Sequence, residues 1–321
     1  MTSDQINRIR GVVFGQAIGD ALGLGTEFMN KQQIDDYYYP HGLTDYKQIV
    51  QTDHTSRWEI GDWTDDTDQA LCIMDSIIET NTVNERAFAD HLMKWFNYKP
   101  MDIGMTVIQS LRNPLFTSSP IEVSKKNWEL SNMDNASNGG VMRTSVLGIW
   151  DFFEPTKVRQ NTELICKTTH YDPRCVGSCV IVTEIISRLV RDGSYPTVEE
   201  IKQLGKIYDE RIIEFINLAH ENKDITKLEL DEPHSIGYTL KALSAGLWAF
   251  FHATSFEQGM LAVIAEGGDA DTNAAVACSL MGAKFGFNAI PEKYVSGLLH
   301  EDILRTKVNI LISKIGQMSK A

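Results

Sequence analysis

Four glycines recur at intervals of four near the N-terminus, at Gly11, Gly15, Gly19 and Gly23. Residues four apart lie on one side of an α-helix, so these glycines would form a ridge without side chains. Each glycine inside a helix costs about 1 kcal/mol relative to alanine. Because close packing has to offset that cost, the ridge predicts a central helix over residues 6–23 that another backbone approaches closely.

Apolar residues at helical spacing dominate the rest of the chain. They predict helices that begin after Asp68, span residues 87–96, 176–190 and 240–251, begin at Ser255, and follow the Gly267–Gly268 pair. Loops are expected at residues 30–63, 112–138 and 221–235. Alternating β-branched segments with hairpin turns are rare, and no repeat or linker divides the chain. We therefore predict an all-α fold, a compact helical bundle forming one domain over residues 1–321.

The charge of the chain disfavours two kinds of partner. Its 43 acidic and 30 basic residues give a formal net charge of −13, which disfavours binding to nucleic acid or to an anionic membrane.

No apolar run reaches the length of a membrane span. Gln16 and Asp20 interrupt the apolar N-terminal stretch, which therefore differs from a signal peptide. We expect a cytoplasmic protein.

The cysteines indicate neither a zinc site nor a disulfide framework. There are five, an odd number, within apolar segments of helical pattern, and no Cys-x-x-Cys pair occurs. We expect buried free thiols at Cys72, Cys166, Cys175, Cys179 and Cys278.

A dense group of acids, Thr64-Asp65-Asp66-Thr67-Asp68, precedes one of the predicted helices. In the simplest interpretation Thr64 caps the helix and the acids complement its positive N-terminal end, for about 0.3–1 kcal/mol each. That accounts for one or two carboxylates. A bound cation accounts better for the whole group.

A second, smaller group of aspartates and a threonine opens the helix after Gly267 and Gly268. If the two helix starts converge, each supplies two carboxylates and a hydroxyl. These hard oxygen ligands suit Mg²⁺ or Mn²⁺, and four carboxylates could bridge two ions. The sequence leaves open whether the groups meet. The six candidate ligands are Thr64, Asp65, Asp66, Asp269, Asp271 and Thr272.

Five motifs in order, from about residue 10 to residue 285, resemble the ADP-ribosylglycohydrolase family, which includes the dinitrogenase reductase-activating glycohydrolases. They are GDALGLGTE, WTDDTDQAL, NGGVMR, TH with DPR after it, and GGDADTNAA. The resemblance implies an all-helical fold with two Mg²⁺ or Mn²⁺ ions at the bottom of an ADP-ribose cleft. The same six residues match the family's metal-ligand positions.

The resemblance also implies roles for residues outside the two acidic groups. Glu27 matches a catalytic or gating glutamate beside the metals, although a solvated residue at a helix end would have the same sequence context. Asp65 and Asp66 are the other candidates for the catalytic carboxylate.

The NGGVMR segment would by itself indicate a turn entering a helix, with backbone N–H groups free to approach a phosphate. The resemblance makes Asn138, Gly139 and Gly140 ADP-ribose contacts and places His170, otherwise an ordinary structural histidine, near the phosphates and ribose. Arg143 fits either a ligand contact or a structural ion pair. Asp172 and Arg174 are expected to support the His170 loop.

The implied reaction is metal-dependent hydrolysis of the bond between ADP-ribose and a protein side chain, with arginine first among the linkages. ADP-ribosylated proteins and ADP-ribose are then the partners. The main alternative is an ADP-ribose-binding or immunity protein that blocks an ADP-ribosyltransferase. An isoprenoid synthase is disfavoured, because its D-D-x-x-D motif would need an acid at Gln69.

Overall fold

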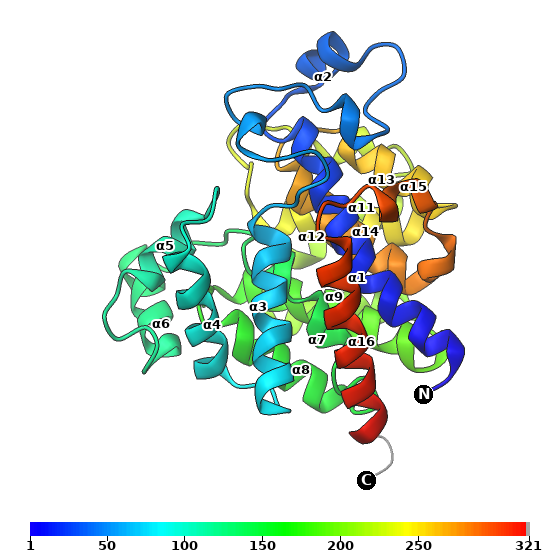
Figure 1. Cartoon of the computed structure of the whole chain (residues 1–321). Coiled ribbons are helices and arrows are strands. Elements are labelled where there is room, and N and C mark those ends of the chain that lie inside the picture. The colour runs from blue at the N-terminus through cyan, green and yellow to red at the C-terminus, as the bar shows by residue number, and fades with distance from the viewer. Residues whose placement is uncertain (319–321) are drawn as a thin grey trace.

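The computed structural model describes residues 1–318, and all of the regular structure in that range is helical (Figure 1). A single antiparallel bridge, between Ser137 and Tyr238, is the nearest approach to a sheet within it. The all-α prediction is confirmed. The α-helices are α1 (Ser3–Gly23), α2 (Lys31–Tyr38), α3 (Asp65–Thr80), α4 (Glu85–Asn97), α5 (Met105–Leu111), α6 (Pro120–Leu130), α7 (Ser145–Ile149), α8 (Pro155–Cys166), α9 (Pro173–Asp192), α10 (Val198–Tyr208), α11 (Arg211–Glu221), α12 (Thr239–His252), α13 (Phe256–Ile264), α14 (Ala270–Phe285), α15 (Glu292–Ser296) and α16 (Glu301–Met318).

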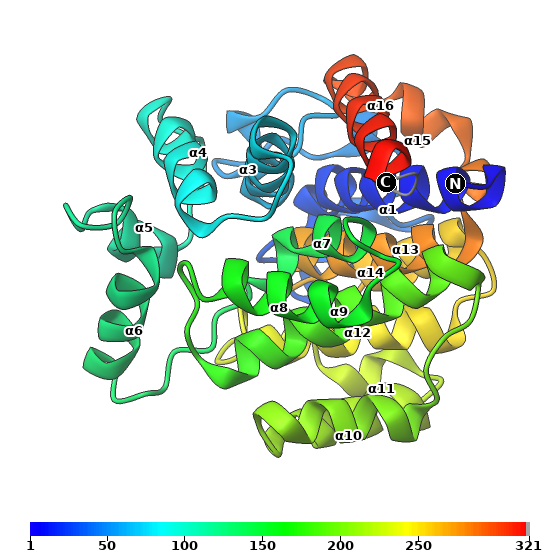
Figure 2. The same ribbon diagram turned by 90° about the horizontal axis from the view of Figure 1, so that it is seen from below.

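The glycine ridge of α1 packs against α14 along its whole length, as predicted. A Cβ atom at Gly11, Gly15 or Gly19 would lie less than 3.0 Å from a backbone carbonyl oxygen of α14. The two helices lie side by side in both ribbon views, with α9 and α12 nearby (Figure 2). At the C-terminal end of the ridge, Gly23 contacts the backbone of Asp271. The ridge therefore sets the position of the acidic start of α14.

Replacing Gly15 by alanine should destabilise the protein by about 3 kcal/mol, because overpacking against rigid backbone outweighs the gain in helix propensity. Its new methyl group would collide with the carbonyl oxygen of Cys278. Gly316→Ala is the matched control, because the nearest atom to a Cβ there, among the described residues, is the Met1 methyl carbon at 3.7 Å. Chemical denaturation should show that variant unchanged or up to about 1 kcal/mol more stable. Equal stability of the two variants would contradict a tightly packed ridge.

Two of the predicted loops contain helices that their sequences conceal. Residues 30–63 include α2, which Asn30 and Gln33 start with a reciprocal capping box. Residues 112–138 include α6, which begins at Pro120. Both helices are short and mostly polar, so the apolar spacing that reveals longer helices is absent from them. The third predicted loop, at residues 221–235, contains only the short 3₁₀ turn Ile225–Leu228.

Other expectations concern burial and extent. All five cysteines are buried and free, as predicted. Among the described residues, no helix is long and apolar enough to cross a membrane. One apolar core includes residues from Ile9 to Ile315, and on that basis we propose that the chain is a single domain. The last three residues of the predicted domain lie outside the described range.

Candidate active site

The two acidic groups meet at the N-terminal ends of α3 and α14. The Thr64 hydroxyl donates a hydrogen bond to Oδ2 of Asp271 at 3.2 Å. The Thr272 hydroxyl donates to Oδ2 of Asp66, also at 3.2 Å. Each helix start thus holds a carboxylate of the other, which joins segments about two hundred residues apart.

Unsatisfied carboxylate oxygens remain at this junction. Oδ1 of Asp66 and Oδ1 of Asp271 are buried without a hydrogen-bond partner among the described residues. Buried charged oxygens are costly unless a donor or cation compensates them. Glu27, Asp269 and Asp271 each offer an oxygen within 4.8 Å of the others. This set of hard oxygen donors fits Mg²⁺ or Mn²⁺.

The electrostatics of the site also favour binding of a cation. Burial raises the pKa of Asp66 well above its ordinary value, and the charges of Asp20, Asp65 and Asp269 add to this effect. Burial likewise raises the pKa of Asp271, followed by repulsion from Glu27, Asp66 and Asp269. A bound cation would relieve this repulsion and favour the ionised carboxylates.

Other acids nearby have structural partners instead. The Asp20 carboxylate accepts hydrogen bonds from the backbone N–H groups of Thr64 and Thr67, both at 2.9 Å, and thereby caps α3 from another helix. Asp68 accepts the indole N–H of Trp63 and that of Trp95, each at 2.9 Å. The acids near the starts of α3 and α14, here called the acidic cluster, therefore fall into two groups. Asp20 and Asp68 stabilise the fold, whereas Asp66 and Asp271 line the site.

Glu27 lies directly beside the start of α14. The backbone N–H of Phe28 donates to the carbonyl of Gly268 at 2.6 Å, and the N–H of Gly268 donates to the carbonyl of Met29 at 2.9 Å. Both Gly267 and Gly268 have a positive φ, and a side chain on either would collide with a neighbouring carbonyl. Burial raises the pKa of Glu27 well above its ordinary value, and the charge of Asp269 raises it further. Glu27 is therefore buried, not a solvated residue at a helix end.

A cavity of about 450 Å³ opens over these carboxylates. Among the predicted site residues, Thr64 and Gly140 do not line it, whereas the others do: Glu27, Asp65, Asp66, Asn138, Gly139, His170, Asp269, Asp271 and Thr272. Thr64 instead faces Asp271 behind the cavity wall. A Cβ atom on Gly140 would meet the sulfur atoms of Cys166 and Cys179, which places this residue beneath the wall.

Sequence reasoning missed the part of the cavity wall between α4 and α5. This part includes Asp102 and residues 103–107, which run into the start of α5, and Phe28 also lines the cavity, next to Glu27. Asp102 raises the pKa of Glu27 and of Asp65, after burial, which places a further negative charge close to the site. The family motifs that we recognised do not include this stretch, and its composition gives no signal of a site.

The NGG segment touches the acidic centre through Asn138. Its side-chain amide donates to Oδ2 of Asp269 at 2.9 Å, and its backbone N–H donates to the carbonyl of Gly237 at 2.9 Å. Asn138 thus ties the cavity wall to the start of α14. Gly139 packs against the His170 ring, which a Cβ would meet at 3.0 Å.

His170 is buried and held at both ring nitrogens, by the Thr169 hydroxyl at 2.7 Å and the Ser137 hydroxyl at 3.0 Å. Burial, followed by the nearby charge of Arg143, lowers the pKa of His170 well below its ordinary value. The ring is therefore neutral. Its contacts with Ser137 and Gly139 help to hold the NGG segment in place.

Arg143 forms no ion pair among the described residues, so the ion-pair interpretation was wrong. Its fully buried guanidinium donates to the Gln69 side chain at 2.6 Å and to the Thr169 hydroxyl at 2.5 Å. It also lies over the Phe88 ring, 5.0 Å from its centroid. Arg143 does not line the cavity. It is a buried cation behind an acidic site, where the neutral oxygens of two side chains hold it.

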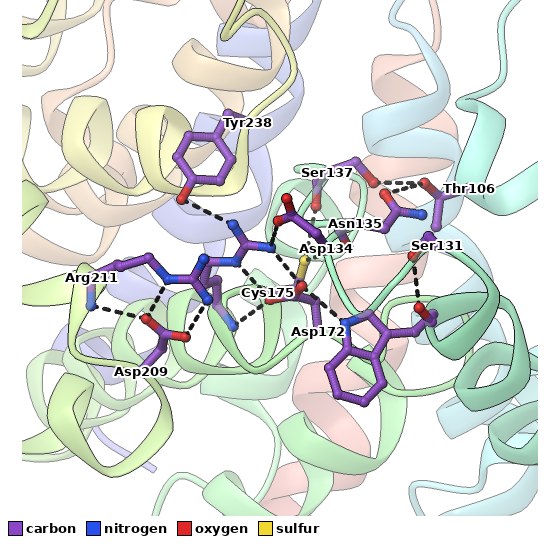
Figure 3. Close-up of polar contacts among 12 residues, drawn as sticks. Thr106, Ser131, Asp134, Asn135, Ser137, Asp172, Cys175, Asp209, Arg211 and Tyr238 are labelled. Atoms are coloured by element: carbon purple, nitrogen blue, oxygen red, sulfur yellow. Dashed lines mark hydrogen bonds and ion pairs between the residues drawn. The ribbon is translucent and has the colours of Figure 1, made fainter.

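Arg174 joins three separate segments through its contacts with Asp172, Asp134 and Tyr238. Figure 3 shows that these three partner residues lie close together. The Arg174 guanidinium donates to both oxygens of Asp172, at 2.8 and 2.7 Å, and to Asp134 at 2.6 Å. It also lies over the Tyr238 ring, 5.6 Å from the centroid. These contacts tie Asp172, two residues after His170, to Asp134 in the loop that leads into Asn138. Support of the His170 loop by Asp172 and Arg174 stays a prediction.

Comparisons with known proteins agree with this geometry. The family model described as ADP-ribosylglycohydrolase matches residues 1–320. The ADP-ribosylarginine hydrolase Tri1 of Serratia proteamaculans is 24% identical over 94% of this chain and 77% of its own length. The ADP-ribosyl-[dinitrogen reductase] glycohydrolase of Rhodospirillum rubrum is 24% identical over 98% of this chain and 99% of its own. A solved ADP-ribosylglycohydrolase-related protein complex has the same fold, with a TM-score of 0.76, 23% identity, and coverage of 98% and 100% of the two chains.

These matches define a class of helical hydrolases that act on ADP-ribose linkages. The chain belongs to the ADP-ribosylglycohydrolase family. It is therefore a hydrolase that acts on ADP-ribosylated substrates, and the predicted resemblance is confirmed.

Proposed function

We propose that this enzyme releases ADP-ribose from arginine side chains of proteins, in a reaction that requires two Mg²⁺ or Mn²⁺ ions. The observation that carries the proposal is the junction of α3 and α14, where Asp66 and Asp271 each retain a buried oxygen without a partner. The proposed ligands are Thr64, Asp65, Asp66, Asp269, Asp271 and Thr272, with Glu27 close enough to Asp269 and Asp271 to join them.

The reaction replaces the bond between C1 of the ribose and the guanidine nitrogen with a bond from C1 to a water oxygen. The water gives up a proton, and the guanidine leaves as the free arginine side chain. When bound, the two ions supply Lewis-acid polarisation of the ribose hydroxyls and of the attacking water. We assign the proton transfers to the carboxyl groups lining the cavity, which are Glu27, Asp65 and Asp66.

The proposed ADP-ribose contacts are Asn138, Gly139 and Gly140, with His170 below them. Asn138 and Gly139 line the cavity, and the Asn138 amide reaches the acidic centre directly. Gly140 contributes by allowing the segment to pack on Cys166 and Cys179. The neutral His170 ring holds Ser137, next to Asn138.

Charge at the cavity wall supports arginine over a neutral linkage. Asp102 and Glu27 both line the cavity, and carboxylates bind a guanidinium through charge-assisted hydrogen bonds. The name of the Serratia relative specifies ADP-ribosylarginine as its substrate, and the name of the Rhodospirillum relative specifies ADP-ribosylated dinitrogen reductase. The five free cysteines suit a reducing compartment, so we place the reaction in the cytoplasm.

The proposal is tested by release of ADP-ribose from arginine-modified and serine-modified proteins, each with Mg²⁺, with Mn²⁺ and with a chelator. We expect metal-dependent release from the arginine-modified protein, and its loss in Asp66→Ala and Asp269→Ala. Release from serine alone would overturn the arginine assignment. Tight ADP-ribose binding without release from either protein would instead favour a blocking role toward an ADP-ribosyltransferase.

A further inference from the structure

The carboxylate of Glu27 is held by a residue far from it in sequence. His54 Nε2 lies 2.5 Å from Oε2 of Glu27. On the other side of the same ring, the Arg57 guanidinium lies 2.5 Å from Nδ1 of His54. The other Glu27 oxygen, Oε1, has no hydrogen bond within the described residues. One oxygen of Glu27 is therefore fixed from outside while the other is left for the site.

The order of these contacts determines where the histidine proton lies. A guanidinium carries only donors, so Nδ1 of His54 must accept from Arg57. The ring hydrogen is therefore on Nε2, which donates to Glu27. A neutral His54 makes both bonds, and the contact with Glu27 does not require a charged ring.

Arg57 is itself fixed in place. Its guanidinium donates to the carbonyl of Met101 at 2.7 Å and to the carbonyl of His54 at 3.1 Å. It also lies over the Trp58 ring, 4.6 Å from the centroid. Because Met101 immediately precedes the cavity wall between α4 and α5, Arg57 ties that wall to the histidine.

Aromatic neighbours restrict the His54 ring as well. Phe28 packs edge-on with ring centroids 5.1 Å apart, and Trp58 lies 5.2 Å away on a tilted plane. The Thr55 hydroxyl donates to the carbonyl of Val50 at 2.7 Å and so closes the turn that contains His54. The ring can therefore neither flip nor withdraw without breaking several contacts at once.

We propose that His54, oriented by Arg57, is a positioning residue that holds Glu27 against the acidic centre. This inference rests on the proposed function for its catalytic consequence. It assigns a purpose to residues 49–58, a segment without a motif, and makes the reach of Glu27 toward Asp269 and Asp271 depend on a single N–H donor. Partners of this kind behind a metal site typically change metal affinity or activity about 10- to 100-fold when removed.

The test compares His54→Ala, His54→Gln and His54→Asn by Mn²⁺ titration followed by electron paramagnetic resonance, and by steady-state kinetics. His54→Ala should weaken Mn²⁺ binding and lower kcat, each about 10- to 100-fold, with little change in KM. Glutamine places its amide N–H near the position of Nε2 and should restore most of both values. Asparagine is one methylene shorter and should not. His41→Ala, at an exposed histidine that also lies between α2 and α3, should resemble the wild type.

A double-mutant cycle with Glu27→Gln separates a positioning role from general damage. If His54 acts through Glu27, adding His54→Ala to Glu27→Gln should change Mn²⁺ affinity no further. Unchanged Mn²⁺ affinity in folded His54→Ala, or a full additional loss in the double variant, would overturn the inference. Absence of ADP-ribose release by the wild type would refute the proposed function, whereas the Mn²⁺ cycle would still decide the role of His54.

Discussion

Replacing Asp271 by asparagine should lower kcat/KM about 10³-fold while the protein remains folded. An asparagine keeps the shape and can still accept from Thr64, but it removes a charge from the proposed metal ligands. Loss of about 4 kcal/mol of transition-state stabilisation corresponds to that factor. The measurement is ADP-ribose release under saturating Mn²⁺, with unfolding of the metal-free variant recorded in parallel.

Asp68→Asn is the matched control, because it lies in the acidic cluster but outside the cavity. Its carboxylate accepts two indole N–H groups, and an asparagine can accept only one of them. We expect a stability loss of about 1–3 kcal/mol from the buried unpaired group, with unchanged activity. Equal loss of activity in the two variants would contradict the division of the cluster into structural and site residues.

Metal-free protein should become less stable as the pH rises from about 4.5 to 7.5. Burial is the main reason that the folded-state pKa values of Asp65, Asp66, Asp271 and Glu27 are raised, and that of Asp20 is raised to about 6. In this range the native state holds protons that the unfolded state has released, so stability falls with increasing pH. For Asp20 alone, the change from 3.8 to about 6 corresponds to about 3 kcal/mol.

His170 and His54 oppose this trend, because burial lowers the pKa of each and the folded state therefore becomes more stable as the pH rises toward 6.5. The two histidines are outweighed by the more numerous buried carboxyl groups. Thermal unfolding at several pH values, with and without Mn²⁺, measures the balance. Bound Mn²⁺ should remove most of the loss at pH 7.5, and Asp66→Asn should flatten the metal-free profile. A metal-free protein that gains stability up to pH 7.5 would show that the site is not strained by its own charges.

The sequence predicted the central helix and both acidic helix starts from local patterns alone. Glycines four apart and acids before an apolar helix are short-range signals, and each has one main physical cause. Hydrophobic periodicity is a local signal, so it cannot predict the contact between Thr64 and Asp271, which are far apart in the sequence. Only the family motifs indicated that the two acidic groups meet.

Local patterns could not identify single residues whose role depends on long-range contacts. His54 and Asp102 lie in stretches without helical spacing or a recognised motif, and their importance comes from contacts with Glu27 and the cavity wall. Arg143 was misjudged because a buried arginine normally has a carboxylate partner, whereas Gln69 and Thr169 hold this one.

The pairing of α1 with α14 also has a consequence for how the protein is made. Helix α1 is apolar and rich in glycine, and it leaves the ribosome long before its main partner α14 has been synthesised. Contacts between such distant segments form slowly and leave apolar surface exposed to aggregation in the meantime. Thr64 and Asp271 are 207 positions apart, so a nascent chain cannot assemble the acidic centre before Asp271 has left the ribosome. Any metal ion that binds the acidic centre as proposed would then be acquired late in folding.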